Sequence, residues 1–457
     1  MENVSIPRLV ANIIWISISA FHYGYHISSL NAAADSIICG GEEATKGWGG
    51  PSCIEMSTFQ FGVVTSAYTV GGLIASLNAG DKIGVWGQKK TAERAAWATL
   101  IGAALVTVAQ SSWVLILGRI IIGLACGIAT VLVPLYLQSV SPPNIAGNIG
   151  ILCQVAINVG ILTAQGISIP FSTPGTGDWR KISFISVFTA ALQIGTSWLV
   201  SSPPPPSSSP IYDVPPTAEE DERAPFITTS ISNTDSPASH IPNKTLPLTV
   251  KEVIQSKDET VKRPLKALVA IMLFQQFSGI NAVMFYSVTI LTAVNPASAK
   301  KTALFVTLVN LVMTLPAIFL IDKLGRRTLL LSSLATMSIS SIVLGYSINN
   351  EMYMVASVGI MAFVVSFAMG LGPLPFVLLG ELPKEEAKSA TASIAVGTNW
   401  ISNLLIGVFF LPLRNLLASL TSSSSSSSPT SSGSGTVFYI FAIISAIGCV
   451  VVGRLLR

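Results

Sequence analysis

Charge is scarce in this chain. Only 11% of its 457 residues are Asp, Glu, Lys or Arg, whereas 50% are hydrophobic, and the mean hydropathy is +0.64. A soluble globular protein carries charge on about a quarter of its residues, because its surface must be solvated. The composition therefore indicates a membrane protein. The net charge of +4 is small and the basic residues do not gather in one stretch, so no nucleic-acid partner is expected.

Side chains for catalysis and metal binding are also scarce. The chain has three histidines and five cysteines, with no zinc-type spacing among them. It contains no Gly-rich phosphate loop and no combination of residues typical of a hydrolase. We therefore expect neither an enzyme nor an ATP-driven pump, and no cofactor or metal.

Long apolar segments are abundant. Each is long enough to cross about 30 Å of hydrocarbon as a helix, and all are too long for barrel strands. The fold class expected is an all-α membrane protein with twelve transmembrane helices in two six-helix bundles. The expected spans are 9–30, 58–80, 92–111, 113–137, 147–170, 182–200, 265–292, 302–321, 328–347, 353–380, 389–411 and 436–456.

A polar interval divides the spans into two sets. Residues 201–264 include the run SSPPPPSSSP and many Ser, Thr, Asp and Glu, without apolar periodicity. This composition predicts a largely disordered cytoplasmic linker with a short surface helix at 246–257. The expected domains are an N-terminal bundle, 1–200, this linker, and a C-terminal bundle, 265–457. Most of the 26 Lys and Arg residues lie on the side of the termini, which predicts that both termini are cytoplasmic.

Polar side chains inside apolar spans are the first candidates for a binding site, because burying them in lipid is costly. In the run LFQQFSGINAVMFYS, Gln275, Ser278 and Asn281 share one helical face, with Gln276 beside them. Amides both donate and accept hydrogen bonds, which suits hydroxyl-rich ligands, and Gly279 permits close approach or local unwinding. The alternative is that these amides only join neighbouring helices. Further candidates, each also compatible with a structural role, are Gln154, Asn310, Asn399, Trp400 and Asn403.

Two further features suit a protein that changes conformation. The run GLGPLPF, with Pro373 and Pro375, cannot stay a regular helix, and predicts either a break that exposes backbone to a ligand or a static kink. Charged residues gather at helix ends, where opposite charges can latch helices in one state. The alternative is plain solvated turns rich in positive residues. The charged candidates are Asp322, Arg326, Arg327, Glu381 and Lys388.

Longer motifs give the chain a family resemblance. They are YGYHISSLNA, GRIIIGLACGIATVLVPLYL, QVAINVGILTAQG and QQFSGINAVMFYS, followed by DKLGRR, GLGPLPFVLLGELP and TNWISN. With these motifs the chain resembles the sugar porters of the major facilitator superfamily over both six-helix halves. The start of the chain and the loop with Cys39 and Cys53 look most like a fungal subgroup associated with the vacuole.

The resemblance implies a sugar site between the two halves. Trp400 would line the cavity. Phe376 stands where glucose transporters usually have Trp, which keeps an aromatic surface but removes an N–H donor. The residues implied to hydrogen-bond sugar hydroxyls are Gln154, Gln275, Gln276, Asn281, Asn310 and Asn399.

Some positions depart from the family pattern. Ser139 and Ala146 occupy the places of a Glu and an Arg near the inner ends of the helices, and Gln88 replaces an expected Arg. Because the Glu and the Arg are lost together, no orphan charge remains. We therefore expect a weaker inner latch in the N-terminal half than in the C-terminal half, where Glu381 and Lys388 remain.

His26 bears on energy coupling. At this place proton-linked sugar porters typically carry Asp and glucose uniporters carry Asn, so the resemblance implies neither mode. Histidine titrates near neutral pH. His26 either senses or carries a proton, or serves as a neutral hydrogen-bonding imidazole, and both readings stay open.

Cys39 and Cys53 lie in a loop on the non-cytoplasmic side, where disulfides can persist. We predict a bridge between them that closes the loop. Two unpaired thiols are the alternative.

The expected function is that of a transmembrane carrier for a sugar, a monosaccharide such as a hexose, by alternating access. Facilitated diffusion is expected, with proton coupling left open. The alternatives are a non-transporting sugar sensor and a membrane factor in vacuolar protein sorting. The expected partners are the sugar and the lipid bilayer, with the protein acting as a monomer in the vacuolar or plasma membrane.

Overall fold

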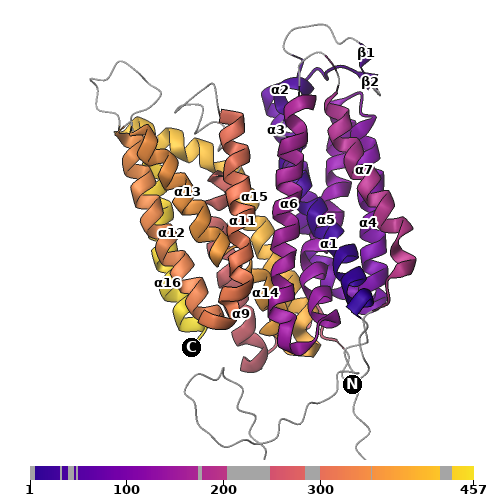
Figure 1. Cartoon of the computed structure of the whole chain (residues 1–457), viewed down its shortest axis with the longest axis vertical. Coiled ribbons are helices and arrows are strands. Elements are labelled where there is room, and N and C mark those ends of the chain that lie inside the picture. The colour runs from indigo at the N-terminus through magenta and orange to yellow at the C-terminus, as the bar shows by residue number, and fades with distance from the viewer. Residues whose placement is uncertain are drawn as a thin grey trace, which may run out of the picture.

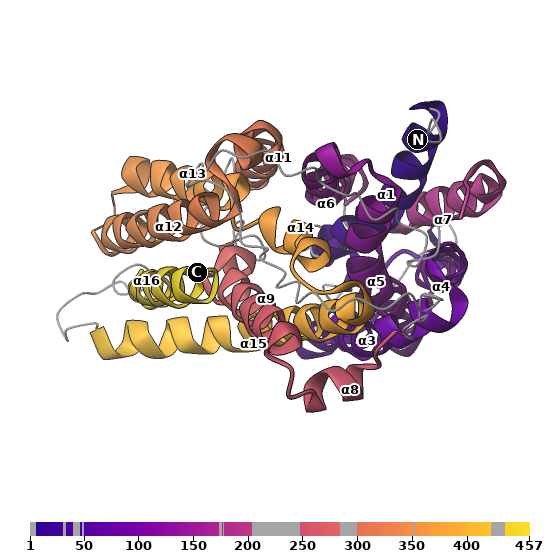
Figure 2. The same ribbon diagram turned by 90° about the horizontal axis from the view of Figure 1, so that it is seen from below.

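The computed structural model describes residues 6–30, 33–39, 46–47, 50–172, 176, 178–202, 247–283, 299–350, 352–421 and 435–457. Within these ranges the chain is almost entirely helical, and its helices form two bundles that stand side by side (Figure 1). The same division is clear from below, where the indigo-to-magenta helices lie on one side and the orange-to-yellow helices on the other (Figure 2). Helix α1 begins and helix α16 ends at one end of the bundles, here named the terminal end; the opposite end carries the strands β1 and β2 and is named the loop end (Figure 1).

The N-terminal bundle contains the first set of long helices. They run antiparallel in succession, as short connections require. Their bounds are α1 (Ile6–Ser28), α3 (Thr58–Trp86), α4 (Gln88–Thr107), α5 (Ser112–Val140), α6 (Ala146–Phe171) and α7 (Trp179–Gly195). Short elements join them: α2 (Ala34–Ile37), β1 (Lys46–Gly47), β2 (Gly50–Pro51), η2 (Pro143–Ile145) and η3 (Ser197–Leu199).

The C-terminal bundle repeats this plan, with one of its spans divided in two. Its long helices are α9 (Glu259–Phe277), α11 (Ala299–Leu324), α12 (Arg326–Asn349), α13 (Tyr353–Met369) followed by α14 (Leu374–Glu381), α15 (Lys388–Thr421) and α16 (Thr436–Leu455). The short elements are α8 (Val250–Gln255) and η5 (Glu385–Ala387).

The expected spans are present as helices, although the last part of the seventh, 284–292, lies outside the described residues. By length and composition alone, 10 membrane-spanning segments are found among the described helices. Helices α1 and α4 complete the two six-helix bundles. Apolar side chains on the outer faces are widely exposed, for example Phe59, Trp113 and Val358, as expected for helices that face lipid. The fold class is therefore an all-α, multi-pass membrane fold.

Helix α9 begins earlier than the sequence suggested, at Glu259 rather than near 265. The reason is a cap: the Asp258 side chain accepts a hydrogen bond from the Thr260 amide at 2.8 Å. The preceding helix, α8, falls within the expected 246–257 and has a capping box in which Thr249 and Glu252 bond each other's backbone amides.

The break predicted in the tenth span is confirmed. Helix α13 ends at Met369 and α14 begins at Leu374, with Gly370 to Pro373 between them. The Ser333 hydroxyl on α12 accepts a hydrogen bond from the freed Leu371 amide at 3.0 Å. Backbone groups that leave a helix inside a membrane protein must be satisfied in this way.

Helices α3 and α5 pack closely because glycines line their contact. A Cβ atom at Gly123 of α5 would lie 2.2 Å from the Tyr68 carbonyl oxygen of α3, and one at Gly127 would lie 2.2 Å from that of Gly72. Only glycine permits backbones to approach so closely, as is common between membrane helices.

Candidate substrate site between the two bundles

The predicted amides of α9 and α15 lie together at the broken span. Gln275 Nε2 donates to the Leu371 carbonyl at 2.9 Å and to the Gly372 carbonyl at 3.2 Å, which are groups freed by the break. Its Oε1 accepts from Asn399 Nδ2 at 2.7 Å. Gln275 and Asn399 are both buried. Gln275 thus links α15 to the buried backbone of the break between α13 and α14.

A second group of amides crosses the boundary between the bundles. Gln154 on α6 donates to Asn158 Oδ1 at 3.1 Å, and Asn158 Nδ2 donates to Thr314 Oγ1 at 2.9 Å and to Asn310 Oδ1 at 3.4 Å on α11. Further toward the loop end, Thr307 donates to Gln165 at 2.8 Å. Gln154 and Asn310 were predicted, whereas Asn158 and Thr314 were not. Their signal was available, because Asn158 lies four residues after Gln154 and shares its helical face.

Gln276 and Asn281 form a third contact, just before the end of the described part of the seventh span. Asn281 Nδ2 donates to Gln276 Oε1. Between them α9 ends at Phe277, and Gly279 adopts φ +93°, a backbone conformation that favours glycine. The unwinding anticipated at Gly279 is present.

Two aromatic residues complete the candidate site. Phe376 lies in α14, directly after the break, and is 6% exposed. Trp400, beside Asn399 on α15, is 1% exposed, and its indole reaches into the N-terminal bundle, where Nε1 donates to Thr130 Oγ1 at 3.2 Å. Of the predicted binding residues, Gln154, Asn310 and Trp400 belong to contacts that cross the boundary of the bundles. Gln275 and Asn399 lie within the C-terminal bundle, at the break.

His26 lies inside the N-terminal bundle. Its Nε2 is 2.8 Å from Ser186 Oγ on α7, which is also 3.2 Å from His22 Nδ1. The buried Arg119 donates to the His26 carbonyl oxygen at 3.1 Å, and its guanidinium lies over the Tyr68 ring, 4.4 Å from the centroid. A buried cation thus stands next to His26. At the position of His26 itself, proton-linked sugar porters typically carry Asp.

Charged side chains meet at the terminal end, but with a different pairing from the one expected. Glu381 pairs with Arg326, which approaches it with Nε at 3.2 Å and Nη2 at 3.1 Å, and Asp322 lies 3.7 Å from the same arginine. Lys388 pairs instead with Glu385, one turn away in sequence. The helix-end charges are therefore joined through Arg326, because the turn after α11 brings this residue against the end of α14.

The Arg326–Glu381 pair also touches the N-terminal bundle. A Cβ atom at Gly147 of α6 would lie 2.6 Å from Arg326 Nη2 and 3.1 Å from Glu381 Oε1. Beside it, the Gln138 amide of α5 fits an orientation in which its nitrogen donates to the Gly380 carbonyl at 2.5 Å and its oxygen accepts from the Glu381 amide at 3.1 Å. The two bundles are thus latched at this end.

The changed family positions and Arg327 make local contacts. Ser139 Oγ donates to Gln88 Oε1 at 2.9 Å, a neutral pair at the place where the sequence pattern lacks its charges. Arg327 Nη2 donates to the Gly453 carbonyl at 3.1 Å and so ties α12 to α16. Ala146 is the first residue of α6.

The loop end carries a disulfide between Cys39 and Cys53. The adjoining residues are fixed to α7, because Trp179 Nε1 donates to the Ser52 carbonyl at 3.0 Å. The buried Arg180 donates to the Pro51 carbonyl and the Ala109 carbonyl, each at 2.5 Å. The bridge and these donors together hold the first loop against α4 and α7.

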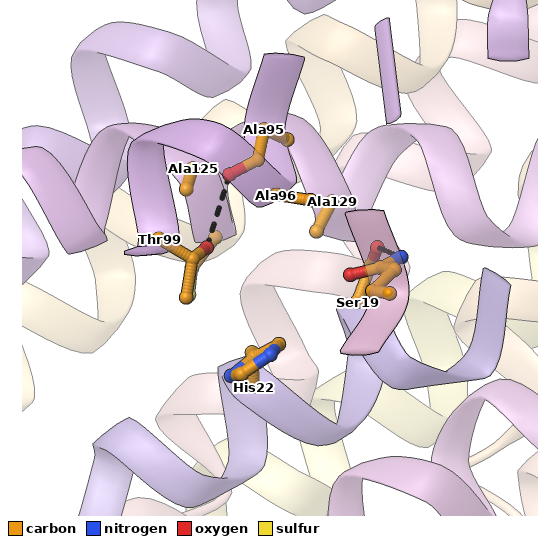
Figure 3. A pocket seen from close by; sticks show the side chains of 9 residues that line it. Ser19, His22, Ala95, Ala96, Thr99, Ala125 and Ala129 are labelled. Carbon is orange, nitrogen blue, oxygen red and sulfur yellow. Dashed lines mark hydrogen bonds between the residues drawn. The ribbon is translucent and has the colours of Figure 1, made fainter. Parts of the chain in front are cut away.

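A small gap in the packing lies elsewhere, within the N-terminal bundle (Figure 3). Ser19 and His22 of α1 face alanines of α4 and α5 across it. The gap is too narrow to hold a water molecule. Its lining residues are Ser19, His22, Ala95, Ala96, Thr99, Ala125, Cys126, Ala129 and Gln193.

Comparison with known proteins now identifies the family. The family model described as "Sugar (and other) transporter" matches residues 11–456. The chain belongs to this family. The resemblance seen in its motifs is therefore confirmed, and so is the expectation that it is a transporter and not an enzyme.

Members and relatives of the sugar transporter family match over most of their length. Facilitated glucose transporter protein 1 of Caenorhabditis elegans is 33% identical over 433 residues, covering 88% of this chain and 82% of that protein. Vacuolar protein sorting-associated protein 73 of Saccharomyces cerevisiae is 27% identical over 482 residues, covering 97% and 94%. Among solved structures, the proton:xylose symporter XylE of E. coli bound to 6-bromo-6-deoxy-D-glucose superposes with a TM-score of 0.74 at 17% identity, covering 99% and 96%. This last likeness shows the major facilitator superfamily fold.

Proposed function

We propose that this protein carries a monosaccharide, of the hexose class, across its membrane by facilitated diffusion with alternating access. The observation that carries the proposal is the group of buried amides at the boundary of the bundles. Asn158 of one bundle bonds Asn310 and Thr314 of the other, and Gln275 with Asn399 lies at the broken helix. Such a boundary both binds a ligand and opens when the bundles rock.

The chemistry of the site favours a neutral, hydroxyl-rich ligand. The predicted binding residues are amides, which donate and accept, and aromatic rings, which pack against the apolar face of a sugar ring. When a hydroxyl enters between Gln275 and Asn399, it can replace their mutual 2.7 Å bond on both sides. The name of the Caenorhabditis elegans relative, a glucose transporter, agrees with this ligand class.

The contacts at the terminal end support alternating access. Gly80 of α3 donates from its amide to Ser393 Oγ of α15 at 2.6 Å, and the Arg326–Glu381 pair lies against Gly147. Polar contacts of this kind separate without leaving a large apolar surface behind. We propose that they close this end in the state described and part in the opposite state.

For energy coupling we favour the neutral role of His26. A proton on His26 would place a second positive charge beside buried Arg119, whose guanidinium donates to the His26 carbonyl at 3.1 Å. Like charges in a low-dielectric interior repel strongly. The neutral imidazole instead keeps its bond with Ser186. Facilitated diffusion follows, although a structural relative is titled a proton:xylose symporter.

The decisive experiment is uptake of radiolabelled monosaccharides by purified protein in liposomes. Saturable uptake that Gln275→Ala and Asn281→Ala each abolish supports the proposal. The matched control is Asn350→Ala, an exposed amide at the end of α12 that bonds only its own helix at Tyr346. If uptake is unchanged in both site variants, the assignment of the site is wrong.

The coupling mode needs a second arm of the same assay. Uptake should be the same with and without an imposed pH gradient, and His26→Asn should leave it nearly intact. Gradient-driven accumulation that disappears in His26→Asn would instead establish a proton carrier.

A second function, that of a membrane factor in protein sorting, is suggested by the name of one yeast relative. It is favoured if the protein neither binds nor moves any sugar, whereas binding without flux favours a sensor. We further propose that the protein acts as a monomer with both termini cytoplasmic, in the vacuolar or plasma membrane. The proposed units are 1–200, the linker 201–264 and 265–457, with Trp400, Phe376 and the predicted amides as the ligand-binding residues.

A further inference from the structure

Trp400 belongs to the C-terminal bundle by sequence but is enclosed by the N-terminal bundle. Its side chain is 1% exposed. The rings of Tyr23 of α1 and Tyr68 of α3 meet it edge-on, with centroids at 5.4 Å and 5.5 Å. Gly72 of α3 and Thr130 of α5 complete the enclosure. These four residues, Tyr23, Tyr68, Gly72 and Thr130, are named the indole slot.

The slot admits the indole only because residue 72 has no side chain. A Cβ atom at Gly72 would lie 2.4 Å from Cη2 and Cζ3 of Trp400 and 2.6 Å from Cε3. Those atoms are the far edge of the indole ring, which cannot bend away. A larger residue at position 72 would therefore expel Trp400 from the slot.

The polar end of the slot is matched to the indole N–H. The Thr130 hydroxyl donates to the Gly127 carbonyl at 3.0 Å, so its oxygen is left as an acceptor, and Trp400 Nε1 donates to it at 3.2 Å. The walls are themselves fixed. Tyr68 Oη donates to the Tyr23 carbonyl at 3.2 Å, and the Arg119 guanidinium lies over the Tyr68 ring.

The slot is also connected to the amides of the candidate site. Asn399 precedes Trp400 on α15 and donates to Gln275 Oε1 at 2.7 Å, and Gln275 in turn holds the backbone of the broken span. A displaced indole would turn this part of α15 and disturb the Asn399–Gln275 bond. The N-terminal bundle thereby influences amides of the C-terminal bundle.

We propose that the indole slot positions Trp400 at the sugar site, and that the indole must leave the slot when the bundles separate. Gly72, Thr130 and Tyr68 are then positioning residues, which act on the sugar through Trp400. This inference rests on the proposed sugar transport. It adds residues of the N-terminal bundle that set the affinity for sugar at a site that includes Asn399 and Gln275 of the C-terminal bundle.

The test is a double-mutant cycle on the hydrogen bond. Thr130→Val removes the acceptor and Trp400→Phe removes the donor while keeping an aromatic ring. Thr130→Val should raise the KM for uptake by about tenfold with little change in maximal rate, since it leaves the buried indole N–H unpaired. Trp400→Phe should also raise the KM, since its ring has no N–H to hold it to Thr130. The double variant should be no worse than Trp400→Phe alone, because both changes break one bond. The control, Thr107→Val, replaces a buried threonine that bonds only Ala103 of its own helix.

A second pair of variants tests the steric part. Gly72→Ala should weaken uptake, whereas Gly84→Ala, on the same helix with open space around its Cβ position, should not. Three results would overturn the proposal. Thr130→Val could have the same KM as Thr107→Val, the two changes in the cycle could have additive effects on KM, or Gly72→Ala could take up sugar as well as Gly84→Ala. A variant that merely folds poorly lowers the maximal rate and leaves KM unchanged, and this result counts against positioning too.

Failure of the slot and failure of sugar transport give different results. If the wild-type protein moves no sugar, the proposed function fails and with it the role of the slot in sugar affinity. If the wild type transports saturably and the variants behave as their controls, only the slot is wrong.

Discussion

Asn158 of α6 donates a hydrogen bond to Thr314 of α11 at 2.9 Å, from one bundle to the other. Both side chains are fully buried, and the same amide lies 3.4 Å from Asn310 and accepts from Gln154. One side chain therefore connects two predicted binding residues on opposite sides of the boundary.

Asn158→Ala should lower sugar uptake by about tenfold. The substitution leaves the Gln154 amide without its acceptor in a buried setting, which costs about 1–3 kcal/mol, and removes the bond to Thr314, whose hydroxyl keeps only its bond to the Asn310 carbonyl. Uptake by the purified variant in liposomes measures the effect. Asn78→Ala is the control, since Asn78 is exposed and bonds only the Ile74 carbonyl of its own helix. Equal uptake by the two variants would contradict a role for Asn158.

Glu381→Gln should weaken the closure of the terminal end. It removes one partner of the Arg326 pair that lies against Gly147. The pair is partly exposed, so its loss is expected to shift the balance of states by at most about 1 kcal/mol. Protease accessibility of the terminal-end loops should rise, and the swapped variant Arg326→Glu/Glu381→Arg should restore protection. Lys388→Gln, which affects a pair inside one turn, is the control.

Reduction of the Cys39–Cys53 bridge should lower thermal stability. The two cysteines are separated by 14 positions in the sequence. A disulfide across a loop of this size stabilises the folded protein by about 3 kcal/mol, because it lowers the conformational entropy of the unfolded chain. A thiol reductant should lower the Tm of the wild type. It should lower the Tm of the control variant Cys449→Ser equally, because Cys449 is not in a disulfide. Without reductant, the double variant Cys39→Ser/Cys53→Ser should have a Tm as low as that of the reduced wild type. Reductant should not change it further. A wild-type Tm that is insensitive to reductant refutes this.

The first turn of α9 should become less stable only when the pH falls below about 4. Hydrogen bonds from the Thr260 side chain and amide, with a smaller contribution from Lys384, hold the pKa of Asp258 below its usual 3.8. A lowered pKa means that the stabilisation is fully present above the usual value and is lost as the pH falls through the folded one. Amide exchange at Thr260, corrected for intrinsic rates, should stay slow from pH 7 to 5 and rise below about pH 4. Asp258→Asn should be largely independent of pH in this range.

Many predictions from the sequence concerned local properties, and these were the ones the structure reproduced most directly. Helix positions follow from apolar length, because only a helix satisfies the backbone in lipid. The break at Gly370 to Pro373 and the unwinding at Gly279 follow from residue types that cannot continue a helix. The amides Gln275 and Asn399 stood out since polar groups are costly inside spans.

Contacts between distant helices could not be read in the same way. Glu381 and Lys388 were expected to form the C-terminal latch, as opposite charges that flank one loop, whereas the fold brings Arg326 to Glu381 and pairs Lys388 with Glu385. Trp400 was recognised as a cavity residue, but nothing in one sequence indicates that Gly72 and Thr130 enclose it.

By itself, the sequence determined that this chain is a helical membrane protein and which polar residues its spans bury, because hydrophobic length and buried amides are properties of single segments. Its motifs added the resemblance to sugar porters. The tertiary structure decided which of these residues face one another across the bundles. That choice depends on helix rotation and close approach, which are set by small residues such as Gly72 on one helix and by the shape of a side chain such as Trp400 on another.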